Sequence, residues 1–197
     1  MRPPAPGAPS LDPASDSGAS NSDGITNAAN TSFTGACTDG DSIQLNTDLV
    51  AIGSPAICSG SAYAIAIALA EGTQSINAAA TRSSVDSAAS NGANVVVDRT
   101  APAAPSITAP VGPAAPTFTV AGTATETTGR IVVMESSTTL CTANGPFATS
   151  NWSCQATIGS GGTHNLSATQ TDLAGNISAA STAFAVGIDL IFRNGFQ

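Results

Sequence analysis

The stretch Glu71-Gly-Thr-Gln-Ser-Ile-Asn-Ala-Ala-Ala-Thr81 decides the fold, because Gly161-Gly-Thr-His-Asn-Leu-Ser-Ala-Thr-Gln-Thr171 repeats its pattern. The period is about 90 residues, and a tandem repeat of that size indicates an array of small domains. Arrays of this kind serve reach more often than chemistry. Two further pairs of segments keep the same spacing: Phe33-Thr-Gly-Ala-Cys37 with Phe118-Thr-Val-Ala-Gly122, and Val96-Val-Asp98 with Gly187-Ile-Asp189.

Apolar residues alternate with small or polar ones in short runs of both copies, and this period of two is typical of strands. Turn residues separate the runs, and no stretch shows a helical period with caps. About seven short strands per copy predict an all-β chain of two tandem β-sandwiches. The clearest matching runs are Tyr63, Ile65, Ile67 and Leu69 in the first copy and Trp152, Cys154, Ala156 and Ile158 in the second.

The repeat divides the 197 residues into two domains that meet at Asp98-Arg-Thr-Ala-Pro-Ala-Ala-Pro105. We expect the first domain over residues 11–98 and the second over residues 99–189. Residues 1–10 read as a Pro-rich lead-in, and residues 190–197 as a C-terminal tail. Domains of this size are near the lower limit at which an apolar core stabilises a fold alone.

The cysteines are divided evenly between the copies. Cys37 and Cys58 lie in the first, and Cys141 and Cys154 in the second. Of the three pairings that four cysteines allow, only one disulfide per domain keeps each domain self-contained. Disulfides persist in oxidising compartments, so we expect an extracellular or cell-surface location. A zinc site is the alternative, but the chain lacks the close Cys-x-x-Cys pairs of such sites.

Charged residues make up 9% of the chain, lysine is absent, and the net charge is -8. That balance argues against nucleic acid and anionic membranes as partners, because both require basic patches. It suits divalent cations. No run of about 20 apolar residues exists, so no membrane span is predicted. The opening residues lack the apolar core of a signal peptide, and we therefore expect a piece of a longer secreted protein.

Three segments carry a recognisable pattern: Leu11-Asp-Pro-Ala-Ser-Asp-Ser-Gly-Ala-Ser-Asn-Ser-Asp-Gly-Ile-Thr-Asn27, Val97-Asp-Arg-Thr-Ala-Pro102 and Ala168-Thr-Gln-Thr-Asp-Leu-Ala-Gly-Asn-Ile-Ser178. With them the chain resembles, over residues 9–189, the bacterial Ig-like repeats of large secreted and surface proteins, including biofilm-associated and RTX-type adhesins. The resemblance implies Ig-like sandwiches, a non-catalytic structural or adhesive role, and further repeats of a longer chain as partners. The C-terminal Ile191-Phe-Arg-Asn-Gly-Phe196 also resembles a short tail of secreted proteins from Gram-negative bacteria.

Each copy carries only half of the acidic features of these repeats. The first copy has Arg82-Ser-Ser-Val-Asp86 in place of the Asp-x-Ala-Gly-Asn turn, and the second lacks the long Asp/Ser/Gly opening. An Ig-like topology would bring the remaining oxygen ligands to the seam between the domains, where they could bind Ca²⁺. The expected calcium ligands are Asp16, Asp23, Asp98, Asp172 and Asn176. The alternative is that these residues form Asx-turns and bind nothing.

Other candidate residues favour structural roles. His164 is the single histidine, and one such ligand does not make a metal site. Asp39 and Asp41 form a carboxylate pair that reads more readily as a turn. Tyr63 and Trp152 could stack on sugars, but their matched positions in the strand runs predict core residues.

These observations favour a non-catalytic structural or adhesion module, with Ca²⁺ as the one cofactor to consider. A carbohydrate-binding or other ligand-binding module of a secreted protein is the alternative, with a cell-surface or glycan ligand. An enzyme is disfavoured, because no acidic residue lies in the strongly apolar context that would raise its pKa for acid–base work.

Overall fold

The computed structural model describes residues 1–48 and 50–190. The chain divides into two compact units, Met1–Arg99 and Thr100–Gln197, and each is described by itself below. The tail predicted over residues 190–197 lies, apart from Leu190, outside the described residues.

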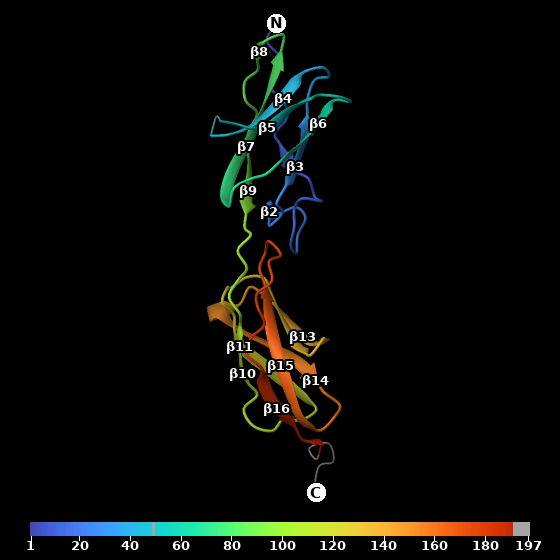
Figure 1. The fold of residues 1–197 in the computed structure, drawn as a ribbon, viewed down its shortest axis with the longest axis vertical. Coiled ribbons are helices and arrows are strands. Elements are labelled where there is room, and N and C mark those ends of the chain that lie inside the picture. The colour runs from blue at the N-terminus through green and yellow to red at the C-terminus, as the bar shows by residue number, and fades with distance from the viewer. Residues whose placement is uncertain (49, 191–197) are drawn as a thin grey trace. The chain divides into compact units, whose positions relative to one another are not determined.

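The first unit is a sandwich of two sheets (Figure 1). One sheet has the strand order β1-β3-β6 and the other the order β2-β9-β7-β4-β5, with β8 paired to β7. All pairings are antiparallel except that of β2 with β9. The strands are β1 Ser10–Leu11, β2 Ile25–Thr26, β3 Thr31–Ala36, β4 Ser42–Thr47, β5 Val50–Ile57, β6 Ala62–Ile67, β7 Gly72–Arg82, β8 Val85–Asp86 and β9 Ala93–Val97.

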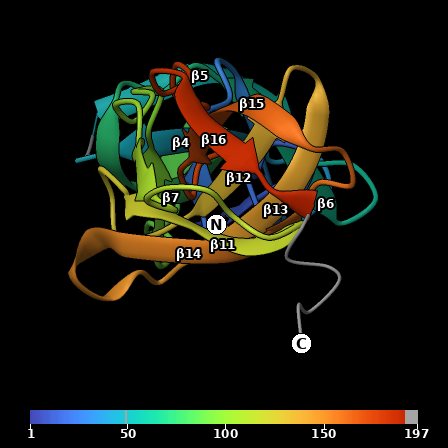
Figure 2. The same cartoon turned by 90° about the horizontal axis from the view of Figure 1, so that it is seen from below.

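The second unit repeats the arrangement with strands β10-β11-β14 in one sheet and β13-β12-β15-β16 in the other. Figure 2 shows β11 and β14 on one side of the unit and β12, β13 and β16 on the other. A single 3₁₀ turn, Ala148–Ser150, precedes β14, and the prediction of an all-β chain is confirmed. The strands are β10 Ser106–Ala109, β11 Thr117–Thr123, β12 Arg130–Glu135, β13 Thr138–Asn144, β14 Asn151–Thr157, β15 Gly162–Thr171 and β16 Phe184–Ile188.

Strand β6 shows how the alternating pattern builds each core. Tyr63, Ile65 and Ile67 are buried, while the alanines between them face solvent. In the second unit Trp152 and Ala156 occupy the matching places on β14, and both are buried. Successive strand residues face opposite sides of a sheet, so this pattern places one apolar face of every sheet against its partner. The inward positions predicted for Tyr63 and Trp152 are therefore confirmed.

Each unit pairs its large aromatic residue with a glycine on the neighbouring strand. Tyr63 lies opposite Gly35, and Trp152 lies opposite Gly122. A Cβ atom on Gly35 would approach the Tyr63 hydroxyl to 2.4 Å, and one on Gly122 would approach Cζ2 of Trp152 to 2.9 Å. Glycine within a strand marks such a close approach. Gly35 lies two residues after Phe33, whereas Gly122 lies four after Phe118 and also makes room for the carbonyl of Ser106.

In both units a Ser-Ala-Ala-Ser segment lies beside the C-terminal half of the longest strand, which is β7 in the first unit and β15 in the second. Ser87 and Ser90 accept hydrogen bonds from the backbone N–H groups of Ala80 and Ala78, both at 2.9 Å. Their own N–H groups donate to the carbonyls of the same two residues, and their hydroxyls donate to the next carbonyl along the chain. Ser178 and Ser181 make the same contacts with Gln170 and Ala168 of β15.

Residues 1–10 pack on the first unit. The N–H of Gly7 donates to the carbonyl of Ala36 at 2.8 Å, and Tyr63 donates its hydroxyl to the carbonyl of Gly7. Pro3, Pro6 and Pro9 are buried. The segment predicted as a lead-in thus forms part of the first sandwich.

Replacing Trp152 by alanine should destabilise the second unit by about 3–5 kcal/mol, because it empties the largest aromatic site in that core. Chemical denaturation followed separately for the two units should show one shifted transition and one unchanged. A change below about 1 kcal/mol would contradict the role of Trp152 in the core.

Replacing Ser178 by alanine should cost about 1–3 kcal/mol, because the N–H of the fully buried Gln170 would lose its acceptor. The exposed Ser153 on β14 provides the control, and its replacement by alanine should change stability by less than about 0.5 kcal/mol. Equal melting temperatures for the two variants would show that the hydroxyl of Ser178 does not stabilise the sheet.

Candidate functional site

The loop between β1 and β3 of the first unit, which contains β2, is rich in Ser, Asp and Asn, and side chains bond its parts together. Ser17 accepts the N–H of Asn27 through its hydroxyl at 2.8 Å, and Thr26 donates its hydroxyl to the carbonyl of Ser15 at 2.6 Å. Asp23 accepts the N–H of Ile25 at 3.0 Å, two residues further on, which makes an Asx-turn. The bonds of Ser17 and Thr26 instead join residues that lie ten and eleven positions apart.

Asp16 lies within this loop and is buried, with an exposed fraction of 6%. Its Oδ2 accepts the N–H of Gly24 at 3.0 Å, whereas its Oδ1 is buried and has no hydrogen-bond partner. Burial raises the pKa of Asp16, the bond from Gly24 opposes that shift, and the nearby Asp23 carboxylate raises the pKa further. Asp16 is thus a desolvated carboxyl group beside a second acid.

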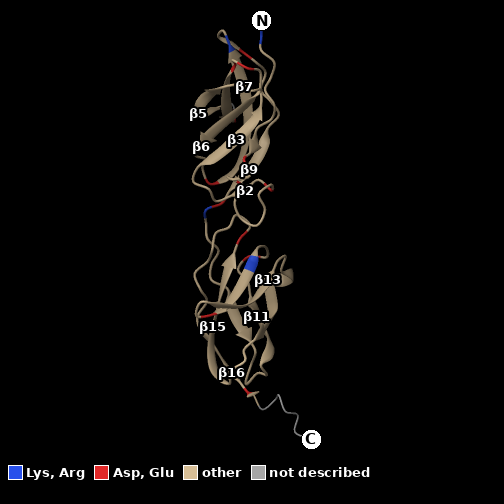
Figure 3. Cartoon of the chain, turned by 90° about the vertical axis from the view of Figure 1, so that its right-hand side faces the viewer, with Lys and Arg blue, Asp and Glu red and all other residues tan. Residues whose placement is uncertain are grey.

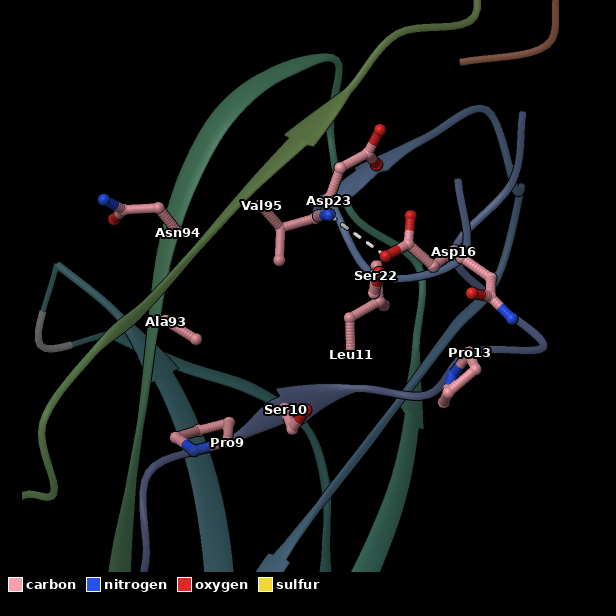
Figure 4. Close-up of a pocket in the computed structure, with 12 residues that line it drawn as sticks. Pro9, Ser10, Leu11, Pro13, Asp16, Ser22, Asp23, Ala93, Asn94 and Val95 are labelled. Atoms are coloured by element: carbon pink, nitrogen blue, oxygen red, sulfur yellow. Dashed lines mark hydrogen bonds between the residues drawn. The ribbon is translucent and has the colours of Figure 1, made fainter. Parts of the chain in front are cut away.

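A pocket of about 320 Å³ opens beside these two residues (Figure 4). Polar groups of the loop line one part of it, including Asn21 and Ser22. Pro9, Leu11 and Val95 line another part: Pro9 directly precedes β1, Leu11 belongs to β1 and Val95 belongs to β9. The pocket therefore combines a carboxylate pair with apolar walls, and all of its lining belongs to the first unit.

Asp98 follows β9 in the first unit, and its N–H donates to the carbonyl of Thr26 at 2.9 Å. Asp172 and Asn176 belong to the second unit, where they close a turn after β15. Oδ1 of Asp172 accepts the N–H groups of Gly175 and Asn176 at 2.7 and 2.8 Å, and its Oδ2 accepts the side-chain amide of Asn176 at 2.8 Å.

The predicted calcium ligands thus fall into separate groups. Asp16 and Asp23 lie together, Asp172 and Asn176 lie together, and the two groups belong to different units. Residues 1–48 and 50–190 contain no group of three or more His, Cys, Asp or Glu residues that could hold a metal ion. Because the units are described separately, a calcium site that combines them stays a prediction.

Both cysteine pairs form disulfides, as the sequence predicts. Cys37 bonds Cys58 across 21 residues, and Cys141 bonds Cys154 across 13. Each disulfide joins residues of one unit and packs against that unit's apolar core. By chain-entropy reasoning, closing loops of this length contributes about 3 kcal/mol per disulfide.

The remaining candidates have structural partners. Asp41 is fully buried and forms an ion pair with Arg82, whose Nη2 lies 2.9 Å from Oδ2. This contact raises the pKa of the Arg82 guanidinium. Asp39 accepts the N–H of Ser61 at 2.6 Å, so the Asp39 and Asp41 side chains brace a turn. His164 contacts Glu135 at 2.8 Å through Nδ1.

Tyr63 and Trp152 are nearly inaccessible, with exposed fractions of 2% and 3%. Burial raises the pKa of Tyr63 to about 12. Neither ring is placed to stack on a sugar at the surface. Figure 3 colours the charged residues on the ribbon, and these fall mainly at strand ends and in loops, while the strands are largely uncharged.

Sequence reasoning identified Asp16 and Asp23 but missed the apolar wall beside them. Leu11 and Val95 are far apart along the chain, and only the sandwich places both at the loop. The serine cover of β7 and β15 was also missed, although Ser87-Ala-Ala-Ser90 and Ser178-Ala-Ala-Ser181 are identical in the two copies. Within the described residues, no helix is long and apolar enough to cross a membrane.

The chain is similar to several solved structures, of which the first supports the fold. The fibronectin(III)-like modules of Clostridium thermocellum CbhA are 16% identical with a TM-score of 0.54, and the alignment covers 92% of this chain and 93% of theirs. The FN1–FN3 domains of chicken CNTN1 are 11% identical, with a TM-score of 0.47 over 94% of this chain and 69% of theirs. The BSP domain of a biofilm associated protein is 19% identical, with a TM-score of 0.34 over 83% of this chain and 28% of that chain.

No curated protein matches the chain. The family model described as bacterial Ig-like domain matches it twice, over residues 3–99 and over residues 111–190. The match accounts for both sandwiches with no catalytic domain beside them, and it confirms the resemblance carried by the sequence motifs. Since the two matched segments make up most of its length, the chain belongs to the bacterial Ig-like domain family.

Proposed function

We propose that the chain is a non-catalytic spacer of a bacterial surface or secreted protein, in which tandem sandwiches carry other parts of a longer chain outward. One observation carries this proposal: each unit closes its own core and has its own disulfide. Modules built this way can be added in series without changing the fold of their neighbours. The disulfides support an extracellular or cell-surface location, because they persist in oxidising compartments.

The bonding of the buried polar groups also supports a structural role. Asp41 pairs with Arg82, Asp172 closes its own turn, and the amide of Gln170 holds the backbone at Glu126 and Thr128. Catalysis requires a nucleophile, base or acid aimed at a common point, and these groups are instead bonded to partners within their own unit. A carbohydrate-binding role is the alternative, and a glycan array that detects specific binding would favour it over the spacer.

Under force, the chain should unfold in two separate steps, one for each sandwich. Reducing the Cys37–Cys58 disulfide, which spans 21 residues, should lengthen one step by about 70 Å. Reducing the Cys141–Cys154 disulfide, which spans 13, should lengthen the other by about 45 Å. Single-molecule force spectroscopy with and without a reductant measures both changes.

A double variant, Cys37→Ala with Cys58→Ala, provides the control for the first unit. It should show the longer step for that unit even without reductant, while the second unit stays unchanged. A single cooperative step for the whole chain would contradict a series of independent modules.

We also propose that calcium fixes the junction of the two units, with Asp16, Asp23, Asp98, Asp172 and Asn176 as its ligands. The support is chemical: the chain has 13 acidic residues and no lysine, and crowded carboxylates repel one another unless a cation lies between them. The structures of the two units leave this proposal untested, because it requires ligands from both.

Calcium should increase the maximum dimension of the chain in small-angle scattering relative to a chelator, and Asp98→Ala should abolish that response. The exposed Asp48 lies in the β4–β5 turn, and Asp48→Ala should leave the response intact. An unchanged dimension, together with no heat of calcium binding by calorimetry, would leave the junction an acidic hinge.

A further inference from the structure

The carboxylates of Asp16 and Asp23 have no cationic partner in the first unit. The ion pairs of Arg82 with Asp41 and of His164 with Glu135 do not include them. The whole chain contains no lysine. The other two arginines of the unit are directed elsewhere: Arg2 donates to the carbonyl of Asp86, and Arg99 donates to the carbonyls of Leu69 and Ala28.

One oxygen of Asp16 lacks a hydrogen-bond donor. Oδ2 of Asp16 accepts the N–H of Gly24, but Oδ1 has no donor although it is buried. A buried carboxylate oxygen without a donor is costly, and such groups are normally paired. The position therefore lacks a donor that carries positive charge.

The walls of the pocket indicate the shape of that donor. Pro9, Leu11, Pro13 and Val95 provide apolar surface, while Asp16, Asp23, Asn21 and Ser22 provide the polar part (Figure 4). The volume of about 320 Å³ holds a chain of several atoms rather than a single ion. Calcium takes six to eight oxygen ligands, more than the two carboxylates of this pocket supply. The calcium site proposed above therefore needs ligands from the second unit as well, and it would compete with an ammonium for Asp16 and Asp23.

We propose that this pocket binds a primary alkylammonium group, with the ammonium between Asp16 and Asp23 and the alkyl stem against Leu11 and Val95. An ammonium has three N–H donors, enough to serve Oδ1 of Asp16 and the carboxylate of Asp23 together. Its carbon stem buries apolar surface while its head stays with the polar groups. Because these 197 residues contain no lysine, the occupant lies outside them, as a lysine side chain of another protein segment or a free aliphatic amine.

Oδ1 of Asp16 is covered in the empty pocket, so the group above it must move for an ammonium to reach it. Asp23 is exposed, and its Oδ1 accepts the N–H of Ile25, so turning its side chain outward breaks one hydrogen bond and leaves the core in place. The bonds of Ser17 and Thr26 are separate from this contact and keep the loop in position.

The test is an NMR titration of the full chain with n-butylammonium chloride at neutral pH, with a chelator present. Amide shifts should be confined to the pocket, at Gly24, Asn94 and Val95, with a Kd on the order of 1 mM. n-Butanol has the same stem without the charge, and it should bind at least about ten-fold more weakly, a difference of about 1.4 kcal/mol.

Asp16→Asn should raise the Kd for n-butylammonium at least about ten-fold, since an asparagine can still accept the N–H of Gly24 but carries no charge. Asp23→Asn should do the same, and it keeps the test valid if Asp16→Asn fails to fold. Asp48→Asn removes an exposed charge outside the pocket and should leave the Kd unchanged. A peptide carrying one lysine, compared with its Nε-acetylated form, then separates a partner side chain from a free amine as the source.

Three results would overturn the proposal: no shifts with n-butylammonium, equal binding of n-butanol, or equal binding to the Asp16→Asn, Asp23→Asn and Asp48→Asn variants. Shifts with calcium but not with n-butylammonium would also overturn it and assign the pocket to a metal ion. The proposal does not depend on the spacer function, because the two-step unfolding under force does not involve the occupant of this pocket.

Discussion

The constraint on which both sandwiches depend is the hydrogen bonding of their longest strand. Strand β7 extends beyond its partner β9, and β15 extends beyond β16, so part of one edge has no strand beside it. Buried N–H groups there need acceptors. Ser87 and Ser90 supply them in the first unit, and Ser178 and Ser181 in the second. The hydroxyl of each serine accepts a strand N–H group, and its own N–H donates to the carbonyl of the same strand residue. With that edge closed by a loop, the same strand can support the core on its inner face, through Ile76 and Ala78 or Leu166 and Ala168.

The two copies share their cores and differ in their loops, and this division matches the roles we assign. The cores set a self-contained module, because the glycine opposite each aromatic ring and the disulfide are both internal to one unit. The loops carry what distinguishes the copies. After β7, Ser83 and Ser84 form a tight turn with positive φ, whereas after β15 Asp172 organises a wider turn. The first unit also has the long polar loop with Asp16 before its last strand's parallel partner, β2. In the second unit a short segment at Ala114 pairs in parallel with Ile188 of the last strand instead.

The fold could be predicted because its determinants are local in sequence. The alternation of Tyr63, Ile65 and Ile67 predicts a strand and shows which of its faces is buried. The even division of the cysteines between the two copies restricts how they can pair. The candidate site could be predicted only in part. Short acidic side chains mark Asp16 and Asp23, but the same residue types also close turns, as Asp172 does. A carboxylate in a candidate site differs from one that closes a turn in its burial and in the number of N–H donors around it. Both properties depend on segments distant in sequence, such as those of Leu11 and Val95. The packing of the first ten residues was missed for the same reason, since Gly7 meets Ala36 through backbone atoms that composition does not reveal.

Amide hydrogen exchange at the covered edge tests the central claim most directly. The amides of Ala78, Ala80, Ala168 and Gln170 donate to serine hydroxyls rather than to a neighbouring strand. If the Ser-Ala-Ala-Ser segments close this edge, these amides should exchange as slowly as the other amides of β7 and β15, through opening of the whole sandwich. Exchange at the rate of an open sheet edge would contradict the account, because the serines would then cover the strand without protecting it.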